Sequence, residues 1–289
     1  MFLRISHLSR YDYTEAVSFA PHELYLRPAD TPRQRLHQFT LTITPEARRI
    51  ATTDPLDNAV DWAYFPAGVS ARRLEFHSDL LIETLDPNPF DFFLRPDAVN
   101  FPFQYDPVEA LALAPCLALR LDTPAADLRA WIAREVNPLP SETVPLLMAL
   151  VAAVHRRVRY TRREEEGIQS VADTFARQSG SCRDQAVFLM EALRMVGLAA
   201  RFVSGYLYEP APVGATEVVP PAMHAWTEVY LPGAGWRGLD SSRGIFCNDA
   251  FVVIAHAATA ETINPVQGKF IGASTVTSTL TTDLKIQRL

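Results

Sequence analysis

The sequence predicts an α+β protein, in which a domain of helices packed on an antiparallel sheet follows a β-sandwich-like N-terminal domain. Three observations lead to this prediction. The first ninety residues contain stretches of alternating apolar and polar side chains, residues 86–124 are rich in proline, and helical spacing of apolar residues begins only after that stretch. The chain has 289 residues, enough for two domains. We place the boundary after residue 115, which gives a β-rich domain at 1–115 and a second domain at 116–289.

The N-terminal strands are predicted from alternation with a period of two. Residues 35–43 show it clearly, because Leu36, Phe39, Leu41 and Ile43 lie near one face once the alternation is shifted by one residue after Leu36. Several short strands separated by turns favour a sandwich. The other expected strands are 2–13, 59–65 and 72–84.

The second domain is predicted to begin with helices and to continue with strands. Apolar residues recur at three- and four-residue spacing in the helical part, and Pro and Gly mark a tight turn in the later part. The expected helices are 126–136, 143–159 and 182–196, and the expected strands are 200–208, 224–231 and 236–240, the last two joined by a turn at 232–235.

The composition excludes several classes of protein. Its 27 Lys and Arg against 33 Asp and Glu give a net charge of −6, which opposes the basic face of a nucleic-acid-binding protein. The run 156–166 starts with arginines but ends with three glutamates at 164–166, so we interpret it, with the adjoining His155, as a solvated face. No window approaches the roughly 18 apolar residues of a membrane span, and the N-terminus lacks a signal peptide's apolar core. We expect a cytoplasmic protein with neither a nucleic-acid nor a membrane partner.

The three cysteines differ in their surroundings. Cys116, Cys182 and Cys247 cannot all pair and have no CxxC spacing, which indicates thiols in a reducing compartment. Cys182 lies at or next to the start of a predicted helix, where unpaired backbone N–H groups and the helix dipole stabilise a thiolate and can receive an oxyanion. Gly180 would let a substrate approach the backbone. Cys116 and Cys247 are interpreted as structural.

A nucleophilic cysteine needs a base, and His224 has the most suitable context of the seven histidines. It opens a strand and shares a face with Trp226, while Asp240, at the end of the next strand, is the candidate carboxylate that orients the imidazole. A turn at 232–235 would set Asp240 opposite Thr227, leaving His224 roughly 10 Å away at about 3.3 Å per residue. A bulge or a shifted register is needed to bring the two together.

Four segments resemble the bacterial transglutaminase-like superfamily, and their order and spacing cover about residues 155–245. They are Gly180-Ser181-Cys182-Arg183-Asp184-Gln185-Ala186, residues 197–206, His224-Ala225-Trp226-Thr227-Glu228-Val229, and Gly235-Trp236-Arg237-Gly238-Leu239-Asp240. The front half also resembles the β-rich N-terminal region of many members, through the weaker markers Tyr11-Asp12-Tyr13, Leu26-Arg27-Pro28 and Asp57-Asn58-Ala59-Val60.

The resemblance implies a papain-like fold with Cys182 as nucleophile, His224 as general base and acid, and Asp240 as the orienting carboxylate. It also implies thioester chemistry on the amide bonds of a protein or peptide. The sequence departs from the family pattern in two places. Asp-Pro-Thr-Asn-Gly becomes Asp240-Ser241-Ser242-Arg243-Gly244, and Gly-Arg-Asp-Tyr becomes Ala255-His256-Ala257-Ala258.

Three functions are open at this point. Hydrolysis of an amide or peptide bond is favoured, because no segment marks an amine-binding pocket and the loop 208–223, with Pro212 and Gly214, is expected to be an open surface connection. Amine transfer, with protein cross-linking, would use the same three residues. A non-catalytic binding module is the third alternative.

Metal sites are disfavoured. A zinc site formed by Cys182, His224 and Asp240 would lack the closely spaced Cys or His pairs of such sites. No segment has the alternating Asp and Asn ligands of a calcium loop. We therefore expect an enzyme without metal or cofactor.

Overall fold

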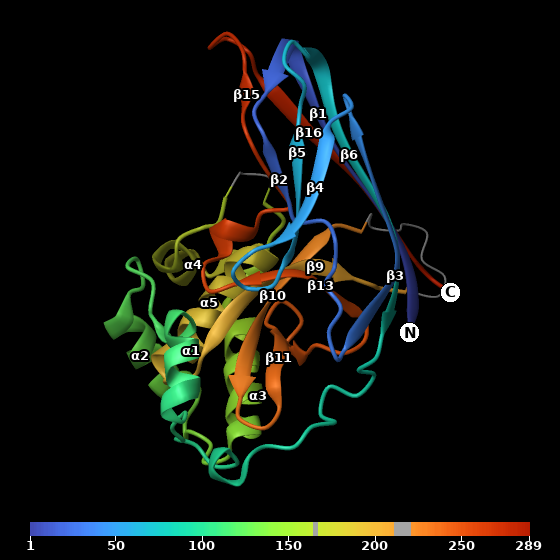
Figure 1. The fold of residues 1–289 in the computed structure, drawn as a ribbon. Coiled ribbons are helices and arrows are strands. Elements are labelled where there is room, and N and C mark those ends of the chain that lie inside the picture. Colours follow the sequence, from blue (N-terminus) through green and yellow to red (C-terminus); the bar gives the residue numbers. More distant parts are fainter. Residues whose placement is uncertain (164–166, 211–220) are drawn as a thin grey trace.

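The computed structural model describes residues 1–163, 167–210 and 221–289. Its β-rich part consists of two antiparallel sheets, one in the order β15-β1-β6-β3 with β16 also paired to β1, the other in the order β14-β2-β5-β4 (Figure 1). The strands of the N-terminal half are β1 (Phe2–Phe19), β2 (His22–Leu24), β3 (Gln34–Thr44), β4 (Arg48–Thr53), β5 (Ala59–Tyr64) and β6 (Ala71–Thr84).

The two sheets pack face to face, as the sequence predicts. Val17 of β1, Leu24 of β2, Ala63 of β5 and Phe76 of β6 belong to one buried cluster. The slip in the alternation of residues 35–43 corresponds to a register shift between Leu36 and Gln38 in the pairing of β3 with β6. β4 was not predicted, because all six of its residues are exposed and leave no alternation to detect.

The C-terminal strands return to these N-terminal sheets. β16 (Ser278–Arg288) pairs with β1 from Leu3 opposite Arg288 to Tyr13 opposite Ser278, and β14 (Val266–Gln267) pairs with β2. β15 (Phe270–Ile271) pairs with the end of β1. The division at residue 115 stays a prediction, but it did not include these pairings, because short exposed strands carry little information about distant partners.

The second part is a five-stranded antiparallel sheet with helices packed on it. The strand order is β12-β11-β10-β9-β13, and α5 packs against β10 (Figure 1). The elements are α1 (Pro107–Leu117), α2 (Ala125–Glu135), α3 (Thr143–Arg157), β7 (Arg159–Tyr160), α4 (Val171–Arg177), β8 (Ser179–Gly180), α5 (Cys182–Met195), β9 (Ala200–Leu207), β10 (Met223–Leu231), β11 (Gly235–Asp240), β12 (Ile245–Phe246), β13 (Phe251–Ala257), and the short 3₁₀ helices Pro96–Ala98 and Ala260–Ile263.

The helix α1 lies in the proline-rich stretch, where the sequence analysis expected no helix. Pro107 occupies its first position, where a missing N–H costs nothing, and the Asp106 carboxylate accepts hydrogen bonds from the N–H groups of Val108 and Glu109 at 2.9 Å. Only Leu113 of this helix is buried. The prolines were therefore misleading, because one of them starts a helix instead of preventing it.

Two amide side chains of the N-terminal half complete the edge of the second sheet. Asn58 accepts from the backbone N–H of His256 (2.9 Å) and donates to its carbonyl oxygen (2.8 Å). Gln34 does the same with Val253, at 2.9 and 2.8 Å. Both partners lie on β13, the outermost strand, so the amides supply hydrogen bonds that a further strand would otherwise make.

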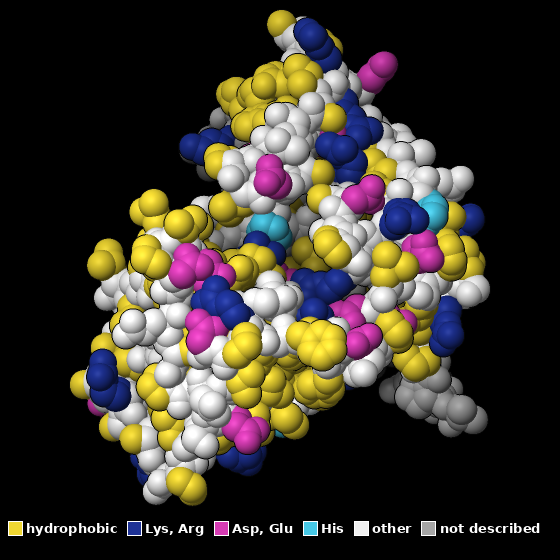
Figure 2. All heavy atoms as spheres, turned by 60° about the horizontal axis from the view of Figure 1, so that its bottom comes forward, with side chains coloured by type: hydrophobic (Ala, Val, Ile, Leu, Met, Phe, Trp, Pro, Cys, Tyr) yellow, Lys and Arg dark blue, Asp and Glu magenta, His cyan; other side chains and the backbone are white. Residues whose placement is uncertain are grey.

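On the face shown in Figure 2, hydrophobic side chains gather in the lower half and again near the top, and Lys, Arg, Asp and Glu side chains are interspersed among the others. None of the helices in the described parts of the chain is long and apolar enough to cross a membrane. The expected cytoplasmic location stays a prediction.

Candidate active site

Cys182 is the first residue of α5, as the sequence predicts. Ser181 caps this helix: the carboxylate of Asp184 accepts hydrogen bonds from the backbone N–H and from the hydroxyl of Ser181, both at 2.8 Å. The sulfur therefore lies at the positive end of a 14-residue helix. A Cβ at Gly180 would come within 2.8 Å of the Asp184 Cβ, so the glycine is required by this close approach.

Asp184 is also held by hydrogen bonds from Arg163 and Gln169. Its two carboxylate oxygens accept from Arg163 at 2.7 and 2.8 Å, and one of them also accepts from the backbone N–H of Gln169 (2.7 Å). Burial would raise the pKa of Asp184, but Arg163 and these hydrogen bonds outweigh burial and lower it. The ion pair fixes the segment that leads into Cys182.

His224 and Asp240 are in direct contact: His224 Nε2 donates to Asp240 Oδ2 at 2.8 Å. The β10–β11 register differs by one residue from the expected one, since Leu231 lies opposite Gly235 and Thr227 opposite Leu239. Continued by one pair, this register sets Asp240 opposite Trp226 and on the same face as His224. A one-residue shift exchanges the two faces of a strand, and it closes the gap that the expected register left.

The thiol of Cys182 lies close enough to the imidazole of His224 to affect its pKa. Because Nε2 is engaged by Asp240, Nδ1 is the ring nitrogen that remains for the sulfur. Burial lowers the pKa of His224, but Asp240 and Cys182 outweigh burial and raise it to about 9. The imidazole is therefore protonated at neutral pH.

The segment after Asp240 holds this carboxylate in place. Asp240 Oδ1 accepts from the backbone N–H (2.8 Å) and from the hydroxyl (2.7 Å) of Ser242. The Ser241 hydroxyl donates to the carbonyl oxygen of Gln185 in α5 (3.1 Å), and the Ser241 carbonyl accepts from Nδ1 of His155 (3.0 Å). The departure from the family pattern at 241–244 thus retains side chains that fix Asp240.

Sequence reasoning missed the part that His155 has in this arrangement. Its neighbouring arginines indicated a solvated face, and the side chain is indeed exposed. The ring nevertheless binds Ser241 and lies against Gly244, where a Cβ would come within 3.2 Å of it. Only the fold brings α3 next to the loop after β11, so no local signal could have identified this contact.

Among the described residues, exposed polar side chains lie near Cys182. Tyr160, on β7, is 55% exposed, and both burial and the nearby Cys182 raise its pKa. Arg243 forms an ion pair with Glu209, and both side chains are exposed. The glutamates at 164–166 and the loop residues Pro212 and Gly214, which the sequence analysis also interpreted, lie outside the described residues.

The two other cysteines have different surroundings from Cys182. Burial raises the pKa of the Cys116 thiol, and it raises that of Cys247 well above the ordinary value. A Cβ at Gly238 would come within 2.9 Å of the Cys247 sulfur, which shows how tightly this thiol is packed. Both thiols are therefore protonated and unreactive at neutral pH.

Beyond His224 on β10, Glu228 joins the two halves of the protein. Its carboxylate is 2% exposed and accepts from Arg201 of β9 at 2.8 Å and from Arg33 of the N-terminal half at 3.1 Å. Arg33 also donates to the carbonyl oxygen of Trp236 on β11. Burial would raise the pKa of Glu228, but the two arginines outweigh it and lower the pKa.

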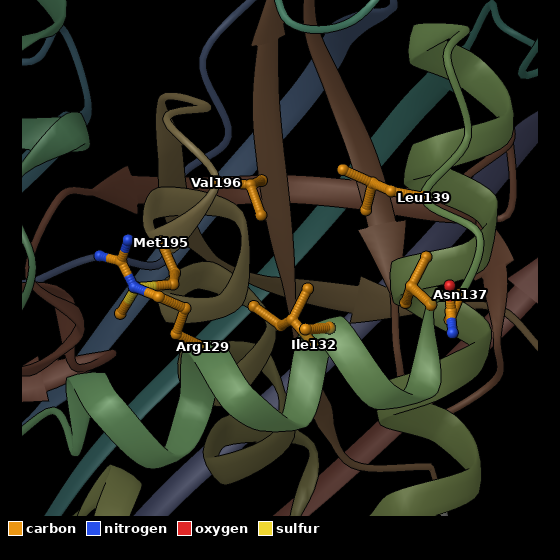
Figure 3. Close-up of a pocket in the computed structure, with 8 residues that line it drawn as sticks. Arg129, Ile132, Asn137, Leu139, Met195 and Val196 are labelled. Atoms are coloured by element: carbon orange, nitrogen blue, oxygen red, sulfur yellow. The ribbon is translucent and has the colours of Figure 1, made fainter.

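A pocket of about 270 Å³ lies at the other end of α5, between α2 and the residues that end α5. Figure 3 shows Ile132, Leu139, Met195 and Val196 around it. At 1.5 Å per residue, the 14 residues of α5 separate this pocket from Cys182 by about 20 Å. It is therefore not part of the site at Cys182.

Metal binding is not apparent at this site or elsewhere in the described parts of the chain, where no three His, Cys, Asp or Glu side chains form a group that could hold an ion. The expected independence from metals stays a prediction.

Known proteins resemble this chain along most of its length. Uncharacterized proteins of Mycobacterium tuberculosis and Mycobacterium bovis are each 26% identical over 273 residues, which span 92% of this chain and 86% of theirs. The crystal structure of a candidate cysteine protease from Cytophaga hutchinsonii superimposes with a TM-score of 0.74 at 17% identity, covering 99% of this chain and 90% of that one. At this identity the likeness establishes the fold.

Two family models match separate parts of the chain. Residues 3–83 match the bacterial transglutaminase-like N-terminal region, and residues 131–241, which include Cys182, His224 and Asp240, match the transglutaminase-like superfamily. The resemblance inferred from the sequence is thereby confirmed. Residues 131–241 thus match a transglutaminase-like core, and residues 3–83 in front of it match the bacterial transglutaminase-like N-terminal region.

Proposed function

We propose that this protein is a cysteine hydrolase that cleaves an amide or peptide bond of a protein or peptide through a thioester on Cys182. The observation that supports the proposal is the position of His224, whose ring is hydrogen bonded to Asp240 and lies close enough to the Cys182 thiol for the two to interact. This is the arrangement that an activated nucleophile, its base and an orienting group require.

In the acylation step the Cys182 thiolate attacks the carbonyl carbon, and the oxygen becomes an oxyanion next to the N–H groups that begin α5. The C–N bond then breaks, and the imidazolium of His224 gives its proton to the leaving amine. The products are a thioester on Cys182, a free amine and a neutral imidazole. Asp240 keeps the ring oriented throughout the step.

In the second step the neutral His224 takes a proton from the acceptor, which then attacks the thioester and releases Cys182 as a thiolate. With water as the acceptor, the product is a carboxylic acid. Exposed polar side chains near Cys182 support water as the acceptor, namely Tyr160 and the ion pair of Arg243 with Glu209. Amine transfer would require a site that excludes water around the thioester.

The first test is selective alkylation of the native protein with iodoacetamide, located by peptide mass spectrometry. Cys182 should react well ahead of Cys116 and Cys247. Cys182→Ala should abolish thioester formation while the protein stays folded, and Cys116→Ala is the matched control that should retain it. Equal labelling of all three thiols would contradict an activated Cys182 and would favour a binding module.

The second test distinguishes hydrolysis from amine transfer. The protein is incubated with a glutamine-containing peptide and a labelled primary amine at a millimolar concentration, and the products are separated by mass. The proposal expects release of the free acid, with the acyl-enzyme trapped at Cys182 after an acid quench. Predominant incorporation of the amine would identify the protein as a transferase.

A further inference from the structure

The helix α1 presents an apolar face to the solvent. Glu109 is its only charged residue, and the other ten residues are apolar. Val108 and Leu111 are 78% and 80% exposed, and the exposed Ala112 and Pro115 complete the spacing i, i+3, i+4, i+7 of one helical face. A surface helix ordinarily turns polar side chains to the solvent, and contiguous exposed apolar patches mark interaction sites. We call these four apolar residues the α1 face.

A pocket of about 400 Å³ borders the α1 face where the two halves of the protein meet. Val108 and Ala112 belong both to this face and to the lining of the pocket. The lining also includes Leu56 of the N-terminal half, which is 45% exposed, and the rings of Tyr230 and Trp236, which meet edge to face at 5.5 Å. A pocket of this kind next to an apolar helix face accepts a large apolar side chain as an anchor.

The charged groups at both ends of α1 are mainly acidic, because one arginine is shared by more than one carboxylate at each end. The ion pairs are those of Arg95 with Asp97, Asp106 and Glu109 at the start of the helix, and those of Arg120 with Asp122 and Glu261 beyond its end. Each arginine neutralises one carboxylate, so negative charge is in excess at both ends. Arg194, close to Cys116 in the last turn, is balanced by Glu191.

The groups across the pocket do not reverse this balance. Arg201 and Arg33 share the carboxylate of Glu228, which leaves one positive charge. Burial and then Arg201 lower the pKa of His256 to about 4, so this ring of the lining is neutral at pH 7. Asp54 lies near enough to His256 to oppose that shift, and its carboxylate offsets the positive charge. The surroundings of the α1 face therefore stay acidic.

This charge distinguishes between the occupants that an apolar face can have. A second copy of the chain would bring acidic groups against acidic groups, because a two-fold interface pairs a surface with itself. Anionic lipids of a membrane would be repelled in the same way. We propose that the α1 face and its pocket bind an amphipathic segment of another protein, which inserts an apolar anchor and carries Lys or Arg around it. This surface does not include Cys182 and does not depend on the proposed hydrolase activity.

The proposal is tested by fluorescence anisotropy of a labelled amphipathic helical peptide titrated with the full chain at pH 7. The peptide has Leu and one Trp on one face and Lys on the other, and its counterpart has Glu in place of every Lys. We expect the Lys peptide to bind saturably with a dissociation constant of about 100 μM or tighter, the weak affinity of a small transient interface. The Glu peptide should bind at least about 10-fold more weakly. Equal binding of the two peptides, or no saturable binding of the Lys peptide, would overturn the proposal.

Two pairs of variants locate the binding. Leu111→Ser truncates the apolar face and should weaken binding of the Lys peptide about 10-fold or more. Met148→Ser is its matched control, because Met148 is 51% exposed on α3 and lies outside the α1 face, and it should leave binding unchanged. Asp97→Asn combined with Glu261→Gln should weaken binding about 3-fold or more, whereas Asp283→Asn on β16 should not.

The other occupants are tested with the same variant. Sedimentation equilibrium of the protein alone measures self-association, and flotation with phosphatidylcholine–phosphatidylserine vesicles measures membrane binding. Self-association or vesicle binding that Leu111→Ser abolishes would assign the α1 face to a second copy or to a membrane, and would overturn the proposal. Binding of the Lys peptide that survives Leu111→Ser would place the peptide elsewhere and would refute the surface. The alkylation rate of Cys182 should be the same in Leu111→Ser as in the unmodified protein.

Discussion

The substitution Asp240→Asn should convert His224 from a protonated to a mostly neutral side chain at pH 7. Burial lowers the pKa of His224, and Asp240 and Cys182 together raise it to about 9. Relative to the ordinary value of 6.5 this is a stabilisation of the imidazolium by about 3 kcal/mol, and about 99% of the rings carry the proton at pH 7. Asparagine keeps the shape of the side chain without its charge. The pKa of His224 should then fall to 6.5 or below, where no more than about a quarter of the rings are protonated.

Nuclear magnetic resonance of protein labelled with ¹³C-histidine measures this directly between pH 5 and pH 10, with His224→Ala to assign the signal. The alkylation rate of Cys182 at pH 7 should fall about 4-fold or more in Asp240→Asn, because fewer molecules carry a protonated His224 beside the sulfur. Asp283→Asn, at an exposed position on β16, is the control and should change neither quantity. The reasoning is refuted by a His224 midpoint near 6.5 in the unmodified protein, or by a midpoint that Asp240→Asn leaves in place.

Further predictions concern the groups around the site and the buried histidines. Ser242→Ala removes one of the two hydrogen bonds from residue 242 to Asp240, so hydrolysis of a test peptide should slow by up to about 10-fold, and Ser242→Thr should restore it. Asp184→Asn breaks the buried pair with Arg163 and should lower the free energy of unfolding by about 3 kcal/mol, measured with urea; an unchanged midpoint would contradict the role of that pair. Burial and, as a smaller effect, the charge of His77 lower the pKa of His7 to about 4 in the folded protein. As the pH falls, the unfolded chain therefore binds a proton at this histidine at a higher pH than the folded chain does. The stability that depends on a neutral His7 is fully present above pH 6.5, and about 3 kcal/mol of the free energy of unfolding should be lost between pH 6.5 and pH 4. The loss should be smaller in His7→Gln. EDTA should leave hydrolysis and Cys182 alkylation unchanged; activity lost with EDTA and restored by zinc would show a metal requirement.

Local patterns predicted the elements of this fold better than their long-range partners. Alternation marked β1, β3, β5 and β6, and helical spacing marked α2, α3 and α5 to within two residues of their observed ends. β4 and β16 escaped because their side chains are mostly exposed. The pairing of β16 with β1 joins segments more than 260 residues apart, and no short-range pattern encodes such a pairing.

The candidate site shows the same difference between local features, which the sequence predicts, and long-range contacts, which it does not. The place of Cys182 at a helix start could be predicted, since capping residues and apolar spacing are local. The contact between His224 and Asp240 could not, because it depends on a one-residue choice of register at the 232–235 turn. Gly233 and Gly235 both have positive φ angles there, at 90° and 72°, and they determine where the hairpin pairs. The anchoring of Ser241 by His155 depends on the packing of α3 and lies beyond any sequence pattern.

The two ion pairs of Glu228 bear on which N-terminal regions of related proteins can be joined to this core. A core taken without its N-terminal region would keep the ion pair of Glu228 with Arg201 but lose the one with Arg33. It would also lose Asn58 and Gln34, and so expose the outer edge of β13 to other chains. A chimera should therefore be more stable when its N-terminal region supplies an arginine for Glu228 and amides for β13.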